Sequence, residues 1–144
     1  MSLNAYQKTQ ASAESASETE YRLFGQVTGA LLEAKEKAYT GGQLMKALDW
    51  NRRLWSTLST DCALPGNGLP NDLRAGIISL SIFVSKHTGL VMRGKADIDD
   101  LININRTIME GLAMQQAKAR EAASAQATPA DGEPPLPEGG VTVG

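Results

Sequence analysis

Apolar residues recur at every third or fourth position in four stretches of this chain, and this spacing constrains its fold more than any other feature. The stripe of the first stretch comprises Phe24, Val27, Leu31, Ala34 and Ala38, and that of the second Leu44, Leu48, Trp55, Leu58 and Cys62. Such spacing places side chains on one face of an α-helix, whereas no stretch reads convincingly as a strand. The sequence therefore predicts an all-α fold, a small single domain of about four helices packed as a helical bundle.

Capping and breaking residues predict where these helices begin and end. The predicted starts are Ser17, about residue 43, Pro70 and Asp97. Ser17 and Glu20 have the spacing of a capping box, and the Asp97 carboxylate can accept a hydrogen bond at the start of the fourth helix. The Pro- and Gly-containing segment 64–68 is a strong helix breaker between the second and third helices.

The two ends of the chain differ in composition from its middle. Residues 1–17 are mostly Ser, Ala, Thr and Gln, and residues 117–144 pass from an Ala-rich run into a Pro-rich one. Because such segments bury little apolar surface, we expect a flexible N-terminal arm at 1–17, a helical domain at 18–116 and a disordered tail at 117–144. No secretory signal opens the chain, and the apolar stretch 75–84 is about half the length of a membrane span. We therefore expect a cytoplasmic protein with no membrane partner.

The third predicted helix is apolar almost all the way round. Ile77, Leu80 and Val84 share one face, while Ile78 and Ile82 point away from Phe83. Such a helix is usually surrounded by other helices, which favours a central core position. The alternative is that part of this apolar girdle, around Ile78 and Ile82, forms a groove for a partner.

Two asparagines occupy positions where apolar residues are expected. Asn51 lies between Leu48 and Trp55 on the second stripe, and Asn105 lies on the apolar face of the fourth helix. A buried amide needs hydrogen-bonding partners and can fix helix register, so a structural role is favoured. The alternative is that one of the two contacts a bound chain.

No arrangement of residues in the chain predicts catalysis or a cofactor. The single cysteine, Cys62, and the single histidine, His87, lack a third group that would orient them as a nucleophile pair. Asp97, Asp99 and Asp100 lack the spacing of a calcium loop and are better explained as helix-start residues. We expect no enzyme, no metal and no cofactor.

The charge of the helical region disfavours direct binding to nucleic acid. Residues 18–116 hold eleven of the 14 basic residues and eleven of the 16 acidic ones, so the region is neutral. Non-specific binding to RNA or DNA depends on a basic excess that displaces counterions. A local basic patch around Arg52 and Arg53 stays open as an exception.

Protein binding is the remaining class, and residues 48–55 are its best candidates. Trp50 points about 140° away from Trp55 on a helix, beside Leu54, so the two tryptophans cannot both join one stripe. Because Trp and Arg are enriched at binding hot spots, Trp50 with Arg52 and Arg53 predicts a contact surface. The equally weighted alternative is that Trp50 and Leu54 pack against a second neighbouring helix. The candidate binding residues are therefore Trp50, Arg52, Arg53, Leu54, Ile78 and Ile82.

The order of the motifs resembles one family, the alphaproteobacterial flagellar biosynthesis regulator FlaF. The strings Trp-Asn-Arg-Arg-Leu-Trp at 50–55 and Arg-Ala-Gly-Ile-Ile-Ser at 74–79 carry the resemblance most clearly. The matching stretches as a whole lie at 2–7, 20–31, 48–55, 67–81, 91–94, 98–102 and 105–109, so the likeness covers roughly residues 2–114. The tail lies outside it.

The resemblance implies a cytoplasmic, non-enzymatic factor that acts on flagellin as a binding partner or export chaperone. It also implies a role in flagellin synthesis alongside the regulator FlbT, and it supplies no catalytic residues. A small neutral helical protein with surplus apolar surface suits helix-in-groove recognition, which agrees with flagellin binding. The alternatives are a regulator that contacts the flagellin transcript and an adaptor that joins flagellin to another regulator.

Overall fold

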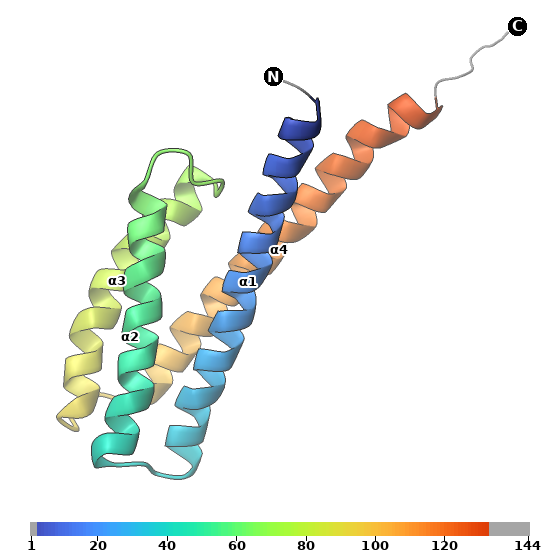
Figure 1. The fold of residues 1–144 in the computed structure, drawn as a ribbon. Coiled ribbons are helices and arrows are strands. Elements are labelled where there is room, and N and C mark those ends of the chain that lie inside the picture. The colour runs from blue at the N-terminus through green and yellow to red at the C-terminus, as the bar shows by residue number, and fades with distance from the viewer. Residues whose placement is uncertain (1–2, 133–144) are drawn as a thin grey trace, which may run out of the picture. The chain divides into compact units, whose positions relative to one another are not determined.

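Four helices and no strand make up the residues that the structure, a computed structural model, describes, namely 3–132, with side chains from 18 to 126. They are α1 (Leu3–Glu36), α2 (Gly41–Ala63), α3 (Asn71–Met92) and α4 (Ile98–Gly132). Figure 1 shows α1, α2 and α3 as neighbouring helices in chain order. The all-α prediction is confirmed. The chain divides into two compact units, Met1–Leu112 and Ala113–Gly144, and the packing described below belongs to the first.

Two helices are longer than the sequence predicts. α1 begins at Leu3, so the predicted start at Ser17 is wrong and the capping-box residues lie inside the helix. α4 continues beyond residue 117 to Gly132. Both extensions are rich in Ala, whose helix propensity is high even where no apolar stripe is present. The flexibility predicted for 1–17 and the disorder predicted for 117–144 stay predictions, and residues 1–2 and 133–144 lie outside the described residues.

The stripe of α1 ends four residues earlier than its spacing predicts. Ala38 is exposed and adopts a left-handed backbone conformation with φ of 52°, so its predicted place in the stripe is wrong. The Tyr39 amide donates to the Ala34 carbonyl at 2.9 Å across this residue. This bond closes the helix with a Schellman-type turn, which here contains alanine where glycine is usual.

The other helix ends agree with the sequence. The Asp97 carboxylate accepts a hydrogen bond from the Asp99 amide at 2.9 Å and so caps α4, as predicted. Pro70 directly precedes α3. Arg74 in the first turn of α3 donates to the carbonyls of Cys62, at 2.9 Å, and Leu64, at 3.2 Å, and thereby satisfies the C-terminal end of α2.

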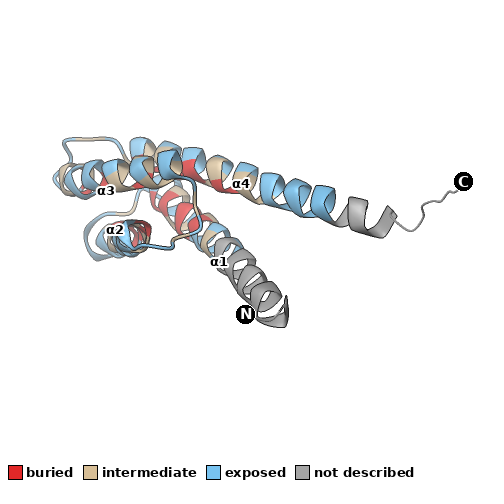
Figure 2. Ribbon diagram, turned by 90° about the horizontal axis from the view of Figure 1, so that it is seen from above, coloured by how far each residue is buried: buried red, intermediate tan, exposed pale blue. Residues whose placement is uncertain are grey.

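The core lies where α1, α2, α3 and the start of α4 meet. Figure 2 shows the buried residues on the inward sides of these helices. Phe24 and Trp55 form an edge-to-face pair with ring centroids 5.6 Å apart. The other large side chains with almost no exposure are Leu31, Leu48, Ile77, Leu101, Ile102 and Leu112.

Asn105 is the centre of a polar cluster inside this core. Its Oδ1 accepts from Trp55 Nε1 at 2.8 Å, and its Nδ2 donates to Asn51 Oδ1 at 2.8 Å and to Thr28 Oγ1 at 3.2 Å. Both asparagines are fully buried. The structural role predicted for them is confirmed, because the cluster joins α1, α2 and α4 through hydrogen bonds that water cannot replace.

The central position predicted for α3 is wrong. Its buried residues are Ile77, Val84, Thr88 and Val91, all toward one side. Ile82 is 57% exposed and Phe83 44% exposed, so the helix is covered on one side only. By length and composition α3 is the one helix among the described residues that could cross a membrane. Its buried side nevertheless packs against the core as in an ordinary bundle helix.

Candidate protein-binding surface

A groove between α1 and α2 is lined by an exposed tryptophan, Trp50. Trp50 is 42% exposed, which confirms that it lies off the stripe occupied by Trp55. The groove encloses about 600 Å³ and is lined by Ala30, Glu33, Tyr39, Gln43, Lys46, Ala47, Asp49, Trp50 and Arg53. Trp50 thus borders a hollow whose other wall includes Ala30 and Glu33 of α1, and part of its indole is open to solvent. Partly exposed tryptophan beside small apolar residues is a common anchor at protein interfaces.

A second groove lies between α2 and α3, and it shares Lys46 and Asp49 with the first. One hollow of about 500 Å³ is lined by Met45, Lys46, Asp49, Arg52, Ser85, Thr88, Gly89 and Met92. The adjoining hollow, of about 350 Å³, is lined by Arg52, Trp55, Ser56, Ser81, Ile82, Val84, Ser85 and Lys86. Because both hollows include Arg52 and Ser85, they form one continuous groove along α2 and α3.

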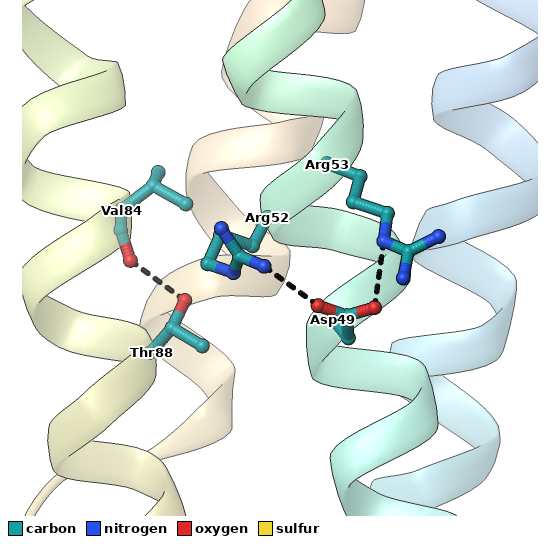
Figure 3. A network of polar contacts seen from close by, with 5 residues as sticks. All are labelled: Asp49, Arg52, Arg53, Val84 and Thr88. Carbon is teal, nitrogen blue, oxygen red and sulfur yellow. Dashed lines mark hydrogen bonds and ion pairs between the residues drawn. The ribbon is translucent and has the colours of Figure 1, made fainter.

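Asp49 stands between the two grooves and holds an arginine on each side. Arg52 Nη2 lies 2.8 Å from Asp49 Oδ1, and Arg53 Nε lies 2.8 Å from Asp49 Oδ2. Figure 3 shows Arg52 on the side of α2 toward α3 and Arg53 on the side toward α1. The hydrogen bond from Arg52, with the positive charge of both arginines, holds the pKa of the Asp49 carboxyl below its usual value. The carboxylate therefore keeps both guanidinium groups close to the helix surface.

The six candidate residues from the sequence do not form one cluster. Trp50 and Arg53 line the α1–α2 groove, whereas Arg52 and Ile82 line the α2–α3 groove. Leu54 and Ile78 are half-buried and pack against the core. The packing alternative therefore describes Leu54 and Ile78, whereas Trp50 lines the groove and is partly exposed to solvent.

Sequence reasoning missed three residues of these surfaces. Met45 and Met92 are 51% and 45% exposed and line the same hollow, although they are far apart in the chain. No pattern along the sequence connects them. Asp49 could have been found, because its spacing of three and four residues to Arg52 and Arg53 is that of ion pairs on a helix.

Cys62 and His87, the cysteine and the histidine of the chain, both pack against neighbouring residues of the fold. Burial, together with the nearby Glu20 carboxylate, raises the pKa of the Cys62 thiol, which makes it a poor nucleophile. His87 stacks on Phe83 with ring centroids 4.9 Å apart, and its Nε2 lies 2.9 Å from Asp100 Oδ2. Among the described residues no group of three or more His, Cys, Asp or Glu is placed to hold a metal ion.

Comparison with known proteins gives a single match. The family model described as flagellar protein FlaF matches residues 2–112, which includes α1, α2, α3 and the first part of α4. No curated protein and no solved structure matches the chain.

Proposed function

This chain belongs to the FlaF family of flagellar proteins, and from this membership we propose that it binds flagellin as a cytoplasmic chaperone or adaptor. In this role it supports flagellin synthesis, secretion and filament assembly. It carries out no catalysis, and FlbT is a candidate second partner.

The exposed Trp50 in the α1–α2 groove is the observation that supports this proposal best. The groove offers apolar side chains from Ala30 and Ala47 beside the indole, and charged side chains at its rim. An amphipathic helix could place its apolar face against Trp50 while its polar face stays in water. Glu33 and Asp49 balance Lys46 and Arg53 around this groove, which suits a partner helix of mixed charge.

The alternative role, direct contact with the flagellin transcript, receives less support. Arg52 and Arg53 are the local basic patch that the sequence leaves open, and both lie against the Asp49 carboxylate. An RNA phosphate would have to compete with this carboxylate for both guanidinium groups. The neutral charge of residues 18–116 adds no long-range attraction for nucleic acid.

Calorimetric titration of the purified full chain with purified flagellin, at low and high salt, tests the proposal. We expect saturable binding that survives high salt, because apolar burial contributes most of the free energy. Trp50→Ala should weaken binding about tenfold, as loss of a hot-spot residue typically does. Tyr21→Ala is the matched control, since Tyr21 is an aromatic residue of similar exposure, 38%, outside the groove.

The transcript arm of the same experiment replaces flagellin with flagellin messenger RNA. Binding to RNA alone, with affinity falling steeply as salt rises, would favour the alternative role. Absence of flagellin binding by a chain whose circular dichroism is helical would refute the chaperone proposal.

A further inference from the structure

The groove between α2 and α3 differs in charge from the one that contains Trp50. The charged side chains that line its two hollows are Lys46, Asp49, Arg52 and Lys86, three basic and one acidic. Within the described part of the chain, neither Lys46 nor Lys86 is in an ion pair. Because Asp49 pairs with Arg52, the net positive charge of the lining comes from Lys46 and Lys86.

Apolar side chains stand at both ends of this groove. Ile82 is 57% exposed at one end, and Met45 and Met92 are 51% and 45% exposed at the other. Ten residues of α3 separate Ile82 from Met92, which corresponds to about 15 Å along the helix axis. This distance matches about three turns of a docked helix with an apolar residue at each end.

The floor between these ends allows a close approach. Ser85 and Gly89 lie on α3 between Ile82 and Met92, and both line the hollow. Thr88 turns its hydroxyl back to the Val84 carbonyl at 2.6 Å, as Figure 3 shows, so that this hydroxyl does not need a partner from outside. A ligand can thus cover the floor without leaving the Thr88 hydroxyl unsatisfied.

We propose that the α2–α3 groove binds an amphipathic helix of a partner protein whose apolar face is flanked by acidic residues. The apolar face contacts Ile82, Met45 and Met92, and the acidic flanks face Lys46 and Lys86. This inference goes beyond flagellin binding at the α1–α2 groove and does not depend on it. The two grooves share Lys46 and Asp49 on α2, and they are distinguished by Trp50 in one and by Ile82, Met45 and Met92 in the other.

The test uses two designed peptides of about 15 residues that share a leucine face and differ only in their flanking charges. One peptide has Glu at the flanking positions and the other has Lys, and both carry a fluorescent label for anisotropy titration with the full chain. We expect saturable binding of the Glu peptide and at least fivefold weaker binding of the Lys peptide. Equal affinity for both peptides would contradict the proposal.

Variants then locate the peptide in the groove. Ile82→Ala should weaken the Glu peptide about tenfold, whereas Leu64→Ala, at an apolar position of similar exposure outside the groove, should not. Lys86→Glu should weaken the Glu peptide and strengthen the Lys peptide, a reversal that misfolding cannot produce. No effect of Ile82→Ala, or an equal loss on Trp50→Ala, would place the peptide elsewhere and overturn the inference.

Two further measurements separate other occupants of the same surface. We expect sedimentation analysis to show no dimer that forms through this groove. A dimer of the unmodified chain that the Ile82→Ala substitution dissociates would instead identify the groove as a self-association surface. We also expect no binding to phosphatidylserine vesicles that the Ile82→Ala substitution weakens. Such binding would mean that the basic rim and the apolar ends contact a lipid surface. Either positive result would overturn the proposal.

Discussion

Two regions of the molecule differ in which groups they bury. The junction of α1, α2 and α4 buries polar groups, whereas the outer side of α3 exposes apolar ones. At the junction Asn51 and Asn105 are fully buried, while on the outer side of α3 Ile82 and Phe83 are 57% and 44% exposed. The buried amides are explained by the bonds they make with each other and with Trp55. Phe83 stacks on His87, but no such contact explains the exposed side chain of Ile82. Exposed apolar surface on a folded domain commonly marks a site of association.

From this difference we expect the first region to determine stability and the second to determine binding. The junction determines how the helices pack, since its buried hydrogen bonds disfavour other registers. Among the described residues, Asn51 Nδ2 is the one buried side-chain nitrogen or oxygen that has no hydrogen-bond partner. Because the side chains on the outer sides of α2 and α3 are largely exposed, we expect them to contribute little to folding. Substitutions should therefore divide into those that change stability and those that change binding alone.

Asn105→Ala should have the largest effect on stability. It removes the acceptor for Trp55 Nε1 and the donor to Asn51 and Thr28, and leaves these buried groups unsatisfied. We expect a loss of about 4 kcal/mol in the free energy of unfolding, measured by urea denaturation. Asn103→Ala, at an exposed position two residues earlier in α4, is the control and should change it by less than about 0.5 kcal/mol. A similar small change for both would show that the buried cluster does not set the stability.

Ile77→Ala and Ile82→Ala compare the two sides of α3 with the same chemical change. Ile77 is fully buried and its truncation should cost about 3 kcal/mol, whereas Ile82→Ala should cost less than about 0.5 kcal/mol. Thermal and urea unfolding followed by circular dichroism measure both values. An equal loss of unfolding free energy in the two variants would mean that Ile82 supports the fold. The two sides of α3 would then not differ in their contribution to stability.

Gly76→Ala tests whether a half-buried position of α3 tolerates a better helix former. A methyl group at Gly76 meets nothing within 4 Å, so the change should raise the free energy of unfolding by about 0.7 kcal/mol. Gly94→Ala should instead lower it by about 1 kcal/mol, because Gly94 has a φ of 70° that alanine adopts at a cost. Urea denaturation of both variants should therefore show changes of opposite sign in the free energy of unfolding.

Glu20 should give the smallest effect, and this effect depends on pH. Burial, with a contribution from the charge of Asp61, raises the pKa of the Glu20 carboxyl in the folded state. Its ionised form therefore destabilises the fold above the folded-state pKa, and the penalty disappears as pH falls below the unfolded-state pKa. Glu20→Gln should stabilise the chain at pH 7 by up to about 0.5 kcal/mol, and by nothing below about pH 4. Glu18→Gln, at an exposed position, is the matched control. A gain that is equal at both pH values would contradict this explanation.

The sequence predicts which residues of α1 and α2 face the core. It does not predict burial where this depends on how the helices pack together. The stripe residues Phe24, Val27 and Leu31 are buried as predicted, because a helix with one apolar face has a single way to bury it. α3 is apolar on several sides, so periodicity cannot identify which side the neighbouring helices cover.

The binding surface shows the same division between local and long-range information. The exposure of Trp50 follows from its angle to Trp55 on one helix, and it is predictable for that reason. The hollow shared by Met45 and Met92 depends on how α2 and α3 lie together, which no spacing along the chain reveals. Asn51 and Asn105 are each placed inward by their spacing, yet the hydrogen bond between them appears only in the fold.

A photo-crosslinking residue placed at position 50 tests most directly whether the outward side chains form a binding surface. The full chain carries p-benzoylphenylalanine in place of Trp50, or in place of Tyr21 as the control, and is irradiated with purified flagellin. The account predicts a covalent adduct with flagellin from position 50 and none from position 21. Retained flagellin binding with no adduct from position 50, or equal adducts from both positions, would contradict it.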